Sequence, residues 1–297
     1  MKKIINSIIV MMAITALVLT ACGSDSTGSG GALSVLASTT FLADITRSIA
    51  GDRINVESLL PAGTDPHAYQ PSPQDMAKIE KSRLIIINGA GYEQFLTTLL
   101  SGEEKNIIEA SAGLSPREDA EHGFDPHMWL DPNLVITYVE NIRKALTEYD
   151  PAGAAVYQTN ADAYVVQLQE LDGWIKKEVA TIPDGQRLFV TNHEAFGYFA
   201  ERYGFEVVGS VIPSFSSNAA PSAQQMAELV DEIEKLNAPA IFLDTADNNT
   251  LAQQISAETG IQVIDDLHLE SLTEGSPAGT YIDMLKYDVS RIVEALK

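Results

Sequence analysis

The stretch Asp125-Pro126-His127-Met128-Trp129-Leu130-Asp131-Pro132 has a shorter counterpart upstream, Asp65-Pro66-His67-Ala68-Tyr69. Each copy reads Asp-Pro-His, one spacer residue and an aromatic residue. Proline fixes its own φ and pushes the residue before it into an extended conformation, so the following histidine is held by stiff backbone. Two chance turns with surface histidines would give the same letters. Two of the five histidines in one frame favour a shared task, and metal binding is the commonest.

The segments around these motifs alternate between strand-like and helix-like patterns. In the first half we expect strands at 33–37, 54–60, 84–87 and 106–109, and helices at 41–50, 73–81 and 92–100. The short apolar run 84–87 is typical of a parallel strand buried on both faces. The loops that carry His67 and His127 should follow the C-terminal ends of strands, where ligands bind in open α/β sheets.

The middle of the chain, 132–182, has no strand pattern. A helix is predicted over 133–149, and Asp150-Pro151 starts another as N-cap and first residue. The apolar positions of that second helix recur at helical spacing and form one face: 157, 161, 164, 168, 171, 175 and 179. Some 30 residues would span roughly 45 Å, which is long enough to run along two domains.

The second half repeats the strand–helix alternation. Strands are expected at 187–191, 206–211, 240–243 and 262–264. Helices are expected at 196–203, at 222–236, after the strand 240–243 as far as 259, and at 281–296. His193 and Asp265 would each follow a strand end. The pattern predicts an α/β fold with two lobes, each a parallel sheet flanked by helices. The lobes would cover 33–149 and 184–297 and be joined by a linking helix at 150–183, with a metal site in the cleft between them.

Residues 1–21 have the pattern of a signal peptide, with Lys2 and Lys3 before an apolar run. The run ends in Leu19-Thr20-Ala21-Cys22, which resembles a bacterial lipobox with Cys22 as the lipidated residue. Cys22 is the only cysteine, and an ordinary signal peptide with a stray cysteine is the alternative. The Gly/Ser/Thr-rich stretch 22–32 is predicted to be a flexible tether.

The net charge of −22 argues against nucleic acid as a partner and is compatible with cations. His67, His127, His193 and Asp265 would give three imidazoles and one carboxylate, a closed four-coordinate set of the kind that holds a metal. A catalytic zinc site needs an open position and a general base, for which Glu194 is the candidate. The usual hydrolase and phosphate-binding motifs are absent, so we expect no enzyme activity.

The sequence also resembles the solute-binding lipoproteins of zinc and manganese ABC importers, known as cluster A-I or cluster 9. The resemblance covers most of 33–297 and rests on both Asp-Pro-His motifs, on 193–199 (His-Glu-Ala-Phe-Gly-Tyr-Phe), and on Asp265 with 280–287. It implies metal ligands at His67, His127, His193 and Asp265. It also implies an extracytoplasmic, lipid-anchored monomer that captures a metal and delivers it to a membrane permease. The third ligand is histidine in zinc-type members and glutamate in manganese-type members, so Zn²⁺ is the expected cargo, with Mn²⁺ possible.

Several alternatives stay open from the sequence. Asp266, and less strongly His268, compete with Asp265 for the fourth position. His122, in the short acidic loop 115–124, could collect metal or lie in plain solvated loop. Asp131 could orient His127 or cap the following helix. A metal-dependent hydrolase and a surface adhesin with a structural metal are the alternative functions.

Overall fold

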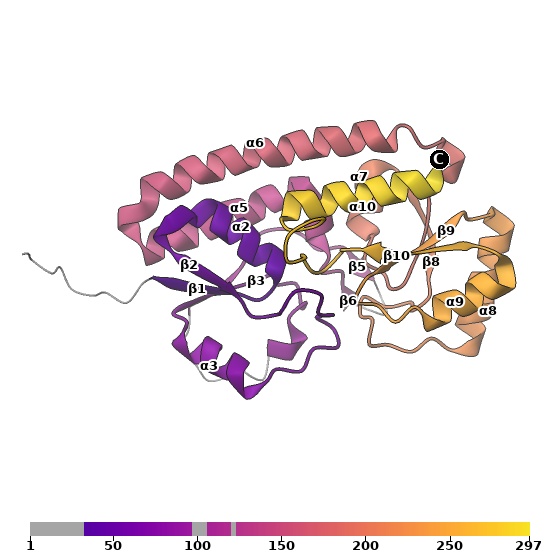
Figure 1. Cartoon of the computed structure of the whole chain (residues 1–297), viewed down its shortest axis with the longest axis horizontal. Helices are drawn as coiled ribbons and strands as arrows, with labels where there is room; N and C mark the ends of the chain where they lie inside the picture. Colours follow the sequence, from indigo (N-terminus) through magenta and orange to yellow (C-terminus); the bar gives the residue numbers. More distant parts are fainter. Residues whose placement is uncertain (1–32, 97–105, 120–122) are drawn as a thin grey trace, which may run out of the picture. The chain divides into compact units, whose positions relative to one another are not determined.

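The computed structural model describes residues 33–96, 106–119 and 123–297, of which Ser34–Lys297 form one compact unit (Figure 1). Cys22, the tether and His122 lie outside the described residues. Within the described ranges, no helix is both long enough and apolar enough to cross a membrane.

The first half of the unit is built on a four-stranded parallel sheet in the order β2-β1-β3-β4. Its strands are β1 (Ser34–Ala37), β2 (Asn55–Ser58), β3 (Leu84–Ile87) and β4 (Asn106–Glu109). Its helices are α2 (Thr40–Ala50), α3 (Pro73–Lys81) and α5 (Pro132–Tyr149). Figure 1 shows α3 on the opposite side of this sheet from α2 and α5. The strand order reverses between β1 and β3, which places a ligand-binding crevice at their C-terminal ends.

The second half repeats the design with the order β10-β9-β7-β8, again all parallel. The strands are β7 (Leu188–Thr191), β8 (Glu206–Ser210), β9 (Ala240–Asp244) and β10 (Gln262–Leu267). The helices are α7 (Gly197–Tyr203), α8 (Ala223–Leu236), α9 (Thr250–Thr259) and α10 (Tyr281–Leu296). The predicted α/β architecture with two helix-flanked parallel sheets is therefore confirmed.

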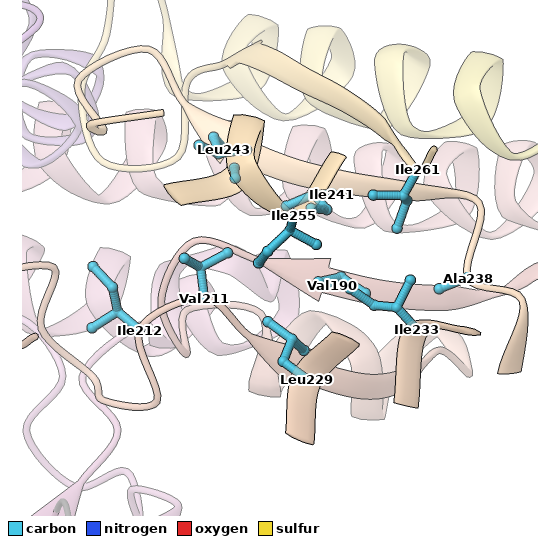
Figure 2. Close-up of a cluster of buried hydrophobic side chains, with 11 residues drawn as sticks. Val190, Val211, Ile212, Leu229, Ile233, Ala238, Ile241, Leu243, Ile255 and Ile261 are labelled. Carbon is cyan, nitrogen blue, oxygen red and sulfur yellow. The ribbon is translucent and has the colours of Figure 1, made fainter. Parts of the chain in front are cut away.

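A dry core fixes the second sheet against its helices. Val190 of β7 and Ile241 of β9 are fully buried, and they pack in one cluster with Leu229 of α8 and Ile255 of α9 (Figure 2). Full burial of such a side chain contributes about 1.5–3 kcal/mol. The cluster makes the strands a rigid base for the loops that leave their C-terminal ends.

The long helix α6 (Ala154–Val179) contacts α2 and α5 from the first half and α7 and α10 from the second. Its buried residues are the seven positions predicted from helical spacing: Tyr157, Ala161, Tyr164, Leu168, Leu171, Ile175 and Val179. Its 26 residues correspond to about 39 Å. A long helix in contact with both halves is thus confirmed, whereas the segment boundaries at 149 and 183 stay a prediction.

Short elements complete the fold. The acidic loop predicted at 115–124 contains a small antiparallel hairpin of β5 (Glu118–Asp119) and β6 (Gly123–Phe124). Where a helix was predicted over 92–100, the described part has a 3-10 turn, η2 (Gln94–Leu96). The other 3-10 turns are η1 (Gly51–Arg53), η3 (Met128–Leu130), η4 (Pro151–Gly153) and η5 (Asp184–Gln186).

Candidate metal centre

Three histidines and one glutamate converge at the C-terminal ends of the two sheets. One possible ligand atom from each of His67, His127, His193 and Glu270 lies within 4.8 Å of the others. Oε1 of Glu270 is 3.0 Å from Nε2 of His67, 3.4 Å from Nε2 of His127 and 3.7 Å from Nε2 of His193. The side chains are nearly dry, since the most exposed of them, His67, is 7% accessible. Three nitrogen donors and a carboxylate could hold one metal ion here.

The Asp-Pro-His motif acts through its aspartate. Asp65 Oδ1 accepts a hydrogen bond from the His67 backbone N–H at 2.8 Å, and Asp125 Oδ1 accepts one from the His127 N–H at 3.0 Å. An aspartate that binds its own backbone two residues on makes a tight turn. Proline then stiffens that turn, so each histidine leaves the backbone in a fixed direction.

Asp125 also orients the ring of His127. Its Oδ1 is 2.9 Å from Nδ1 of His127, and both side chains are buried. With the proton on Nδ1 donated to this carboxylate, Nε2 presents its lone pair to the cluster, as is usual for metal-binding imidazoles. Asp131 instead accepts from the Asn133 N–H at 2.8 Å and caps α5. Of the two roles open for Asp131, the structure therefore shows the cap.

Residues at the reversal of strand order hold the segment that carries His127. Asn88, which follows β3, donates through Nδ2 to the carbonyl of Pro126 at 3.0 Å. The same side chain accepts from the hydroxyl of Tyr138 at 2.6 Å. On the other side, the indole of Trp129 donates to the carbonyl of Leu269 at 2.7 Å, next to Glu270. Trp129 thus links the loop of one ligand to the loop of another.

The structure corrects the fourth position. Asp265 lies inside β10, its side chain is exposed, and it accepts from Nδ2 of Asn249 at 2.9 Å, outside the cluster. The strand was predicted to end at Ile264 but runs on to Leu267, so the loop begins later. Asp266 pairs with Arg291 at 2.9 Å, and it too lies outside the cluster. The structure therefore does not bring Asp265 to the three histidines, and the carboxylate that it places beside them is that of Glu270.

Other candidates from the sequence lie elsewhere. The ring of His268 packs on Tyr287 with centroids 5.4 Å apart. Glu194 follows His193 but is not among the four residues that converge. Tyr69, the aromatic residue of the upstream motif, donates its hydroxyl to Asp75 at 2.6 Å.

Asp244 is the residue that holds the backbone of Glu270 in place, and its position at a strand end could have been noticed in the sequence. It ends β9, is buried, and accepts through Oδ2 from the backbone N–H groups of both Leu269 and Glu270. An aspartate at the end of a buried strand, beside the reversal of strand order between β7 and β9, indicates a supporting residue of a site. Burial and the neighbouring charge of Glu270 raise the pKa of Asp244 to about 7.

For His127 and Glu270, burial and the neighbouring partners shift the pKa in opposite directions. Burial alone would lower the pKa of His127, but hydrogen bonds to Asp125 and Glu270 raise it to about 9. Burial would raise the pKa of Glu270, yet the three histidines hold it well below its usual range. Asp247, whose Oδ1 is 4.0 Å from Nδ1 of His193, has its pKa raised to about 6 by burial. Without metal, the cluster therefore binds a proton at neutral pH, and a cation has to displace that proton when it binds.

Relatives of the chain are named as metal-binding proteins, and some are named as substrate-binding lipoproteins of manganese ABC transporters. It is 37% identical to the manganese-binding lipoprotein MntA of Halalkalibacterium halodurans, covering 100% of this chain and 99% of the relative. It is 34% identical to the iron-binding protein YfeA of Yersinia pestis over 96% of this chain and 93% of the relative. Among solved structures it matches the periplasmic zinc binding protein TroA of Treponema pallidum with a TM-score of 0.85, at 27% identity, over 90% and 99% of the two chains.

The sequence also matches a family described as "Zinc-uptake complex component A periplasmic" over residues 35–295. This range holds both sheets, the long helix α6 and all four residues of the cluster. The chain therefore belongs to the zinc-uptake complex component A family of metal ABC transporter substrate-binding proteins.

Proposed function

We propose that the chain captures one divalent transition-metal ion at His67, His127, His193 and Glu270 and delivers it to the membrane permease of an ABC importer. The observation that carries the proposal is the convergence of three Nε2 atoms on one carboxylate oxygen in a nearly dry site. Two of these ligands come from the first half and two from the second. Holding and releasing the ion would therefore follow from small movements between the two halves.

The proposed cargo on chemical grounds is Zn²⁺. Zinc accepts four nitrogen and oxygen ligands in a tetrahedral set without geometric cost. For a given set of this kind, affinity rises from Mn²⁺ to Zn²⁺ along the Irving–Williams order. The family description and TroA name zinc, which supports this choice.

Mn²⁺ is the second candidate, and the names of relatives support it. MntA is named as manganese-binding, and a protein of Candidatus Liberibacter asiaticus, 29% identical with a TM-score of 0.80 over 89% of this chain and 100% of that one, has been solved bound to manganese. Affinity order and physiological cargo differ when cells keep free zinc scarce, because selectivity then follows metal availability and site geometry.

We further propose that Cys22 carries a lipid that anchors the chain to the outer side of the cytoplasmic membrane. The lipobox-like sequence at 19–22 supports this, as does the word lipoprotein in the name of MntA. The proposal describes a monomer, with the permease as its protein partner.

The test is uptake by cells that lack the chain. Uptake of radioactive zinc and manganese should fall on deletion and return with the wild-type gene, but not with His127→Ala. A Cys22→Ala variant should release the protein from the membrane fraction. A metal-dependent hydrolase would instead turn over p-nitrophenyl esters or phosphates, and an adhesin would retain adhesion after metal removal. Unchanged uptake on deletion, in medium limited for each metal, would contradict the transport function.

A further inference from the structure

Tyr198 joins the segments that carry two of the histidines. Its hydroxyl donates to the backbone carbonyl of Asp125 at 2.8 Å and accepts from the backbone N–H of Arg117 at 2.8 Å. Directly alongside, the N–H of Asp125 donates to the carbonyl of Arg117 at 2.9 Å. The hydroxyl thus links the backbones of Arg117 and Asp125, the residues that flank the paired strands β5 and β6.

The two ends of this bridge belong to different halves of the molecule. Tyr198 lies in the first turn of α7, which follows β7 and His193. Asp125 precedes His127 by two residues and binds both its backbone and its ring. A single hydroxyl therefore fixes the turn that carries His127 to the helix that begins four residues after His193.

The Tyr198 side chain is buried beside Arg117 and next to a small pocket. Tyr198 is only 6% exposed, and the guanidinium of Arg117 lies over its ring at 5.8 Å from the centroid. Arg117 also pairs with Glu201 of α7. Arg117, Asp125 and Gly197 line a pocket of about 220 Å³, so water has room beside the bridge. Loss of the hydroxyl could thus be compensated by water while the direct link between the two segments disappears.

We propose that Tyr198 is a positioning residue that slows metal release by holding the His127 turn against α7. The inference rests on the proposed function, since it concerns the residence time of the captured ion. Release requires His127 and His193 to separate. The two hydrogen bonds of the Tyr198 hydroxyl oppose this separation because both end on the backbone at the base of the His127 turn.

The experiment compares Tyr198→Phe with Tyr203→Phe. Both tyrosines lie on α7 and both are 6% exposed, but the Tyr203 hydroxyl donates to Asp172 of α6 at 3.2 Å, away from the cluster. Release from zinc-loaded protein is followed by stopped flow into excess fluorescent chelator. Urea unfolding of the metal-free proteins measures fold stability separately.

Outer-shell substitutions commonly cost about 10–100-fold in metal affinity, so we expect Tyr198→Phe to release zinc about 10-fold faster than wild type. Tyr203→Phe should release zinc within about 2-fold of wild type even if it unfolds at lower urea. Equal acceleration in both variants would mean general loosening and would overturn the proposal. Unchanged release from Tyr198→Phe would overturn it as well.

Hydrogen exchange on the wild-type protein provides a measurement that needs no variant. Zinc should slow exchange of the Arg117 amide, which donates to the Tyr198 hydroxyl, more than that of the Asn133 amide, which donates to Asp131 at the start of α5. Equal effects on the two amides would overturn the proposal. A wild-type protein that binds no metal would instead refute the proposed function itself.

Discussion

Oε1 of Glu270 lies 3.0 Å from Nε2 of His67, although 203 residues separate them in the chain. Glu270 is placed by backbone bonds to Asp244, and His67 by its turn with Asp65. Residues of the opposite half also hold these segments, since the Ser217 hydroxyl donates to Asp65 and the Trp129 indole donates to the carbonyl of Leu269. A cation at the cluster would be ligated by the Glu270 carboxylate together with the imidazoles, and would thereby join the two halves.

The assignment of Glu270 is tested by comparing Glu270→Gln with Asp265→Asn. Glu270→Gln removes the anionic donor from a dry site, so we expect zinc affinity to fall by at least about 100-fold, the upper end for outer-shell changes. Asp265→Asn changes an exposed side chain and should leave affinity within about 2-fold. Competition titration with a chromophoric chelator measures both. The reverse ranking would restore Asp265 as ligand.

Metal removal should destabilise the folded protein. A ligand that binds only the native state adds RT ln(1 + [L]/Kd), about 4 kcal/mol at a thousandfold excess over Kd. We expect calorimetric melting of the zinc-loaded protein to shift down on addition of EDTA and to recover with added zinc. His127→Ala is the control, because its melt should not respond to either addition. A wild-type melt indifferent to EDTA would contradict metal binding at the cluster.

Metal affinity should depend on pH over a range set by His127. Its pKa of about 9 lies above the ordinary value of 6.5, so a metal ion has to displace a proton at neutral pH. We expect apparent zinc affinity to fall about tenfold per pH unit as pH drops below 9. Titration calorimetry in buffers of different ionisation enthalpy should detect about one proton released at pH 7.5. Affinity that is flat between pH 7 and 9 would contradict the raised pKa.

The folding stability of the metal-free protein should change with pH in the opposite direction to its metal affinity. A raised folded pKa means that the His127 contribution to stability is present below about 6.5 and is lost as pH rises through about 9. Glu270, whose folded pKa is depressed, contributes above its ordinary value of 4.5 and loses that contribution as pH falls through the depressed value. Urea unfolding of metal-free protein should therefore show declining stability from pH 7 to 10. Glu270→Gln, which lacks the partner charge, should show a weaker decline.

The parts of the fold that repeat a period or a rigid motif could be predicted from the sequence. The buried face of α6 follows from helical spacing alone. The directions of His67 and His127 follow from aspartate and proline, because both act on the backbone within two residues. Such local chemistry needs no knowledge of the partner segment.

Glu270 could not be found in this way because its place depends on where a strand ends. β10 continues to Leu267, with an irregular register after Ile264, and turns the Asp265 side chain to solvent. Pairing with β9, not the sequence of β10 itself, carries the strand that far. The backbone bonds from Leu269 and Glu270 to Asp244 are likewise contacts between distant segments, as is the bridge from Tyr198 to Asp125.

The last prediction concerns the choice between zinc and manganese. His193 supplies one of three nitrogen donors, and its Nε2 is 3.4 Å from that of His127. Substitution His193→Glu would replace a nitrogen by a carboxylate and give two imidazoles and two carboxylates. Because Mn²⁺ prefers oxygen donors, this change should narrow the ratio of zinc to manganese affinity by about tenfold or more, chiefly through weaker zinc binding. Competition titration of both metals measures the ratio, and His193→Gln, which is neutral and of similar size to glutamate, separates lost nitrogen from added charge. A wild-type protein that already binds manganese more tightly than zinc would contradict the role given to the three imidazoles and would require further oxygen donors in the loaded site.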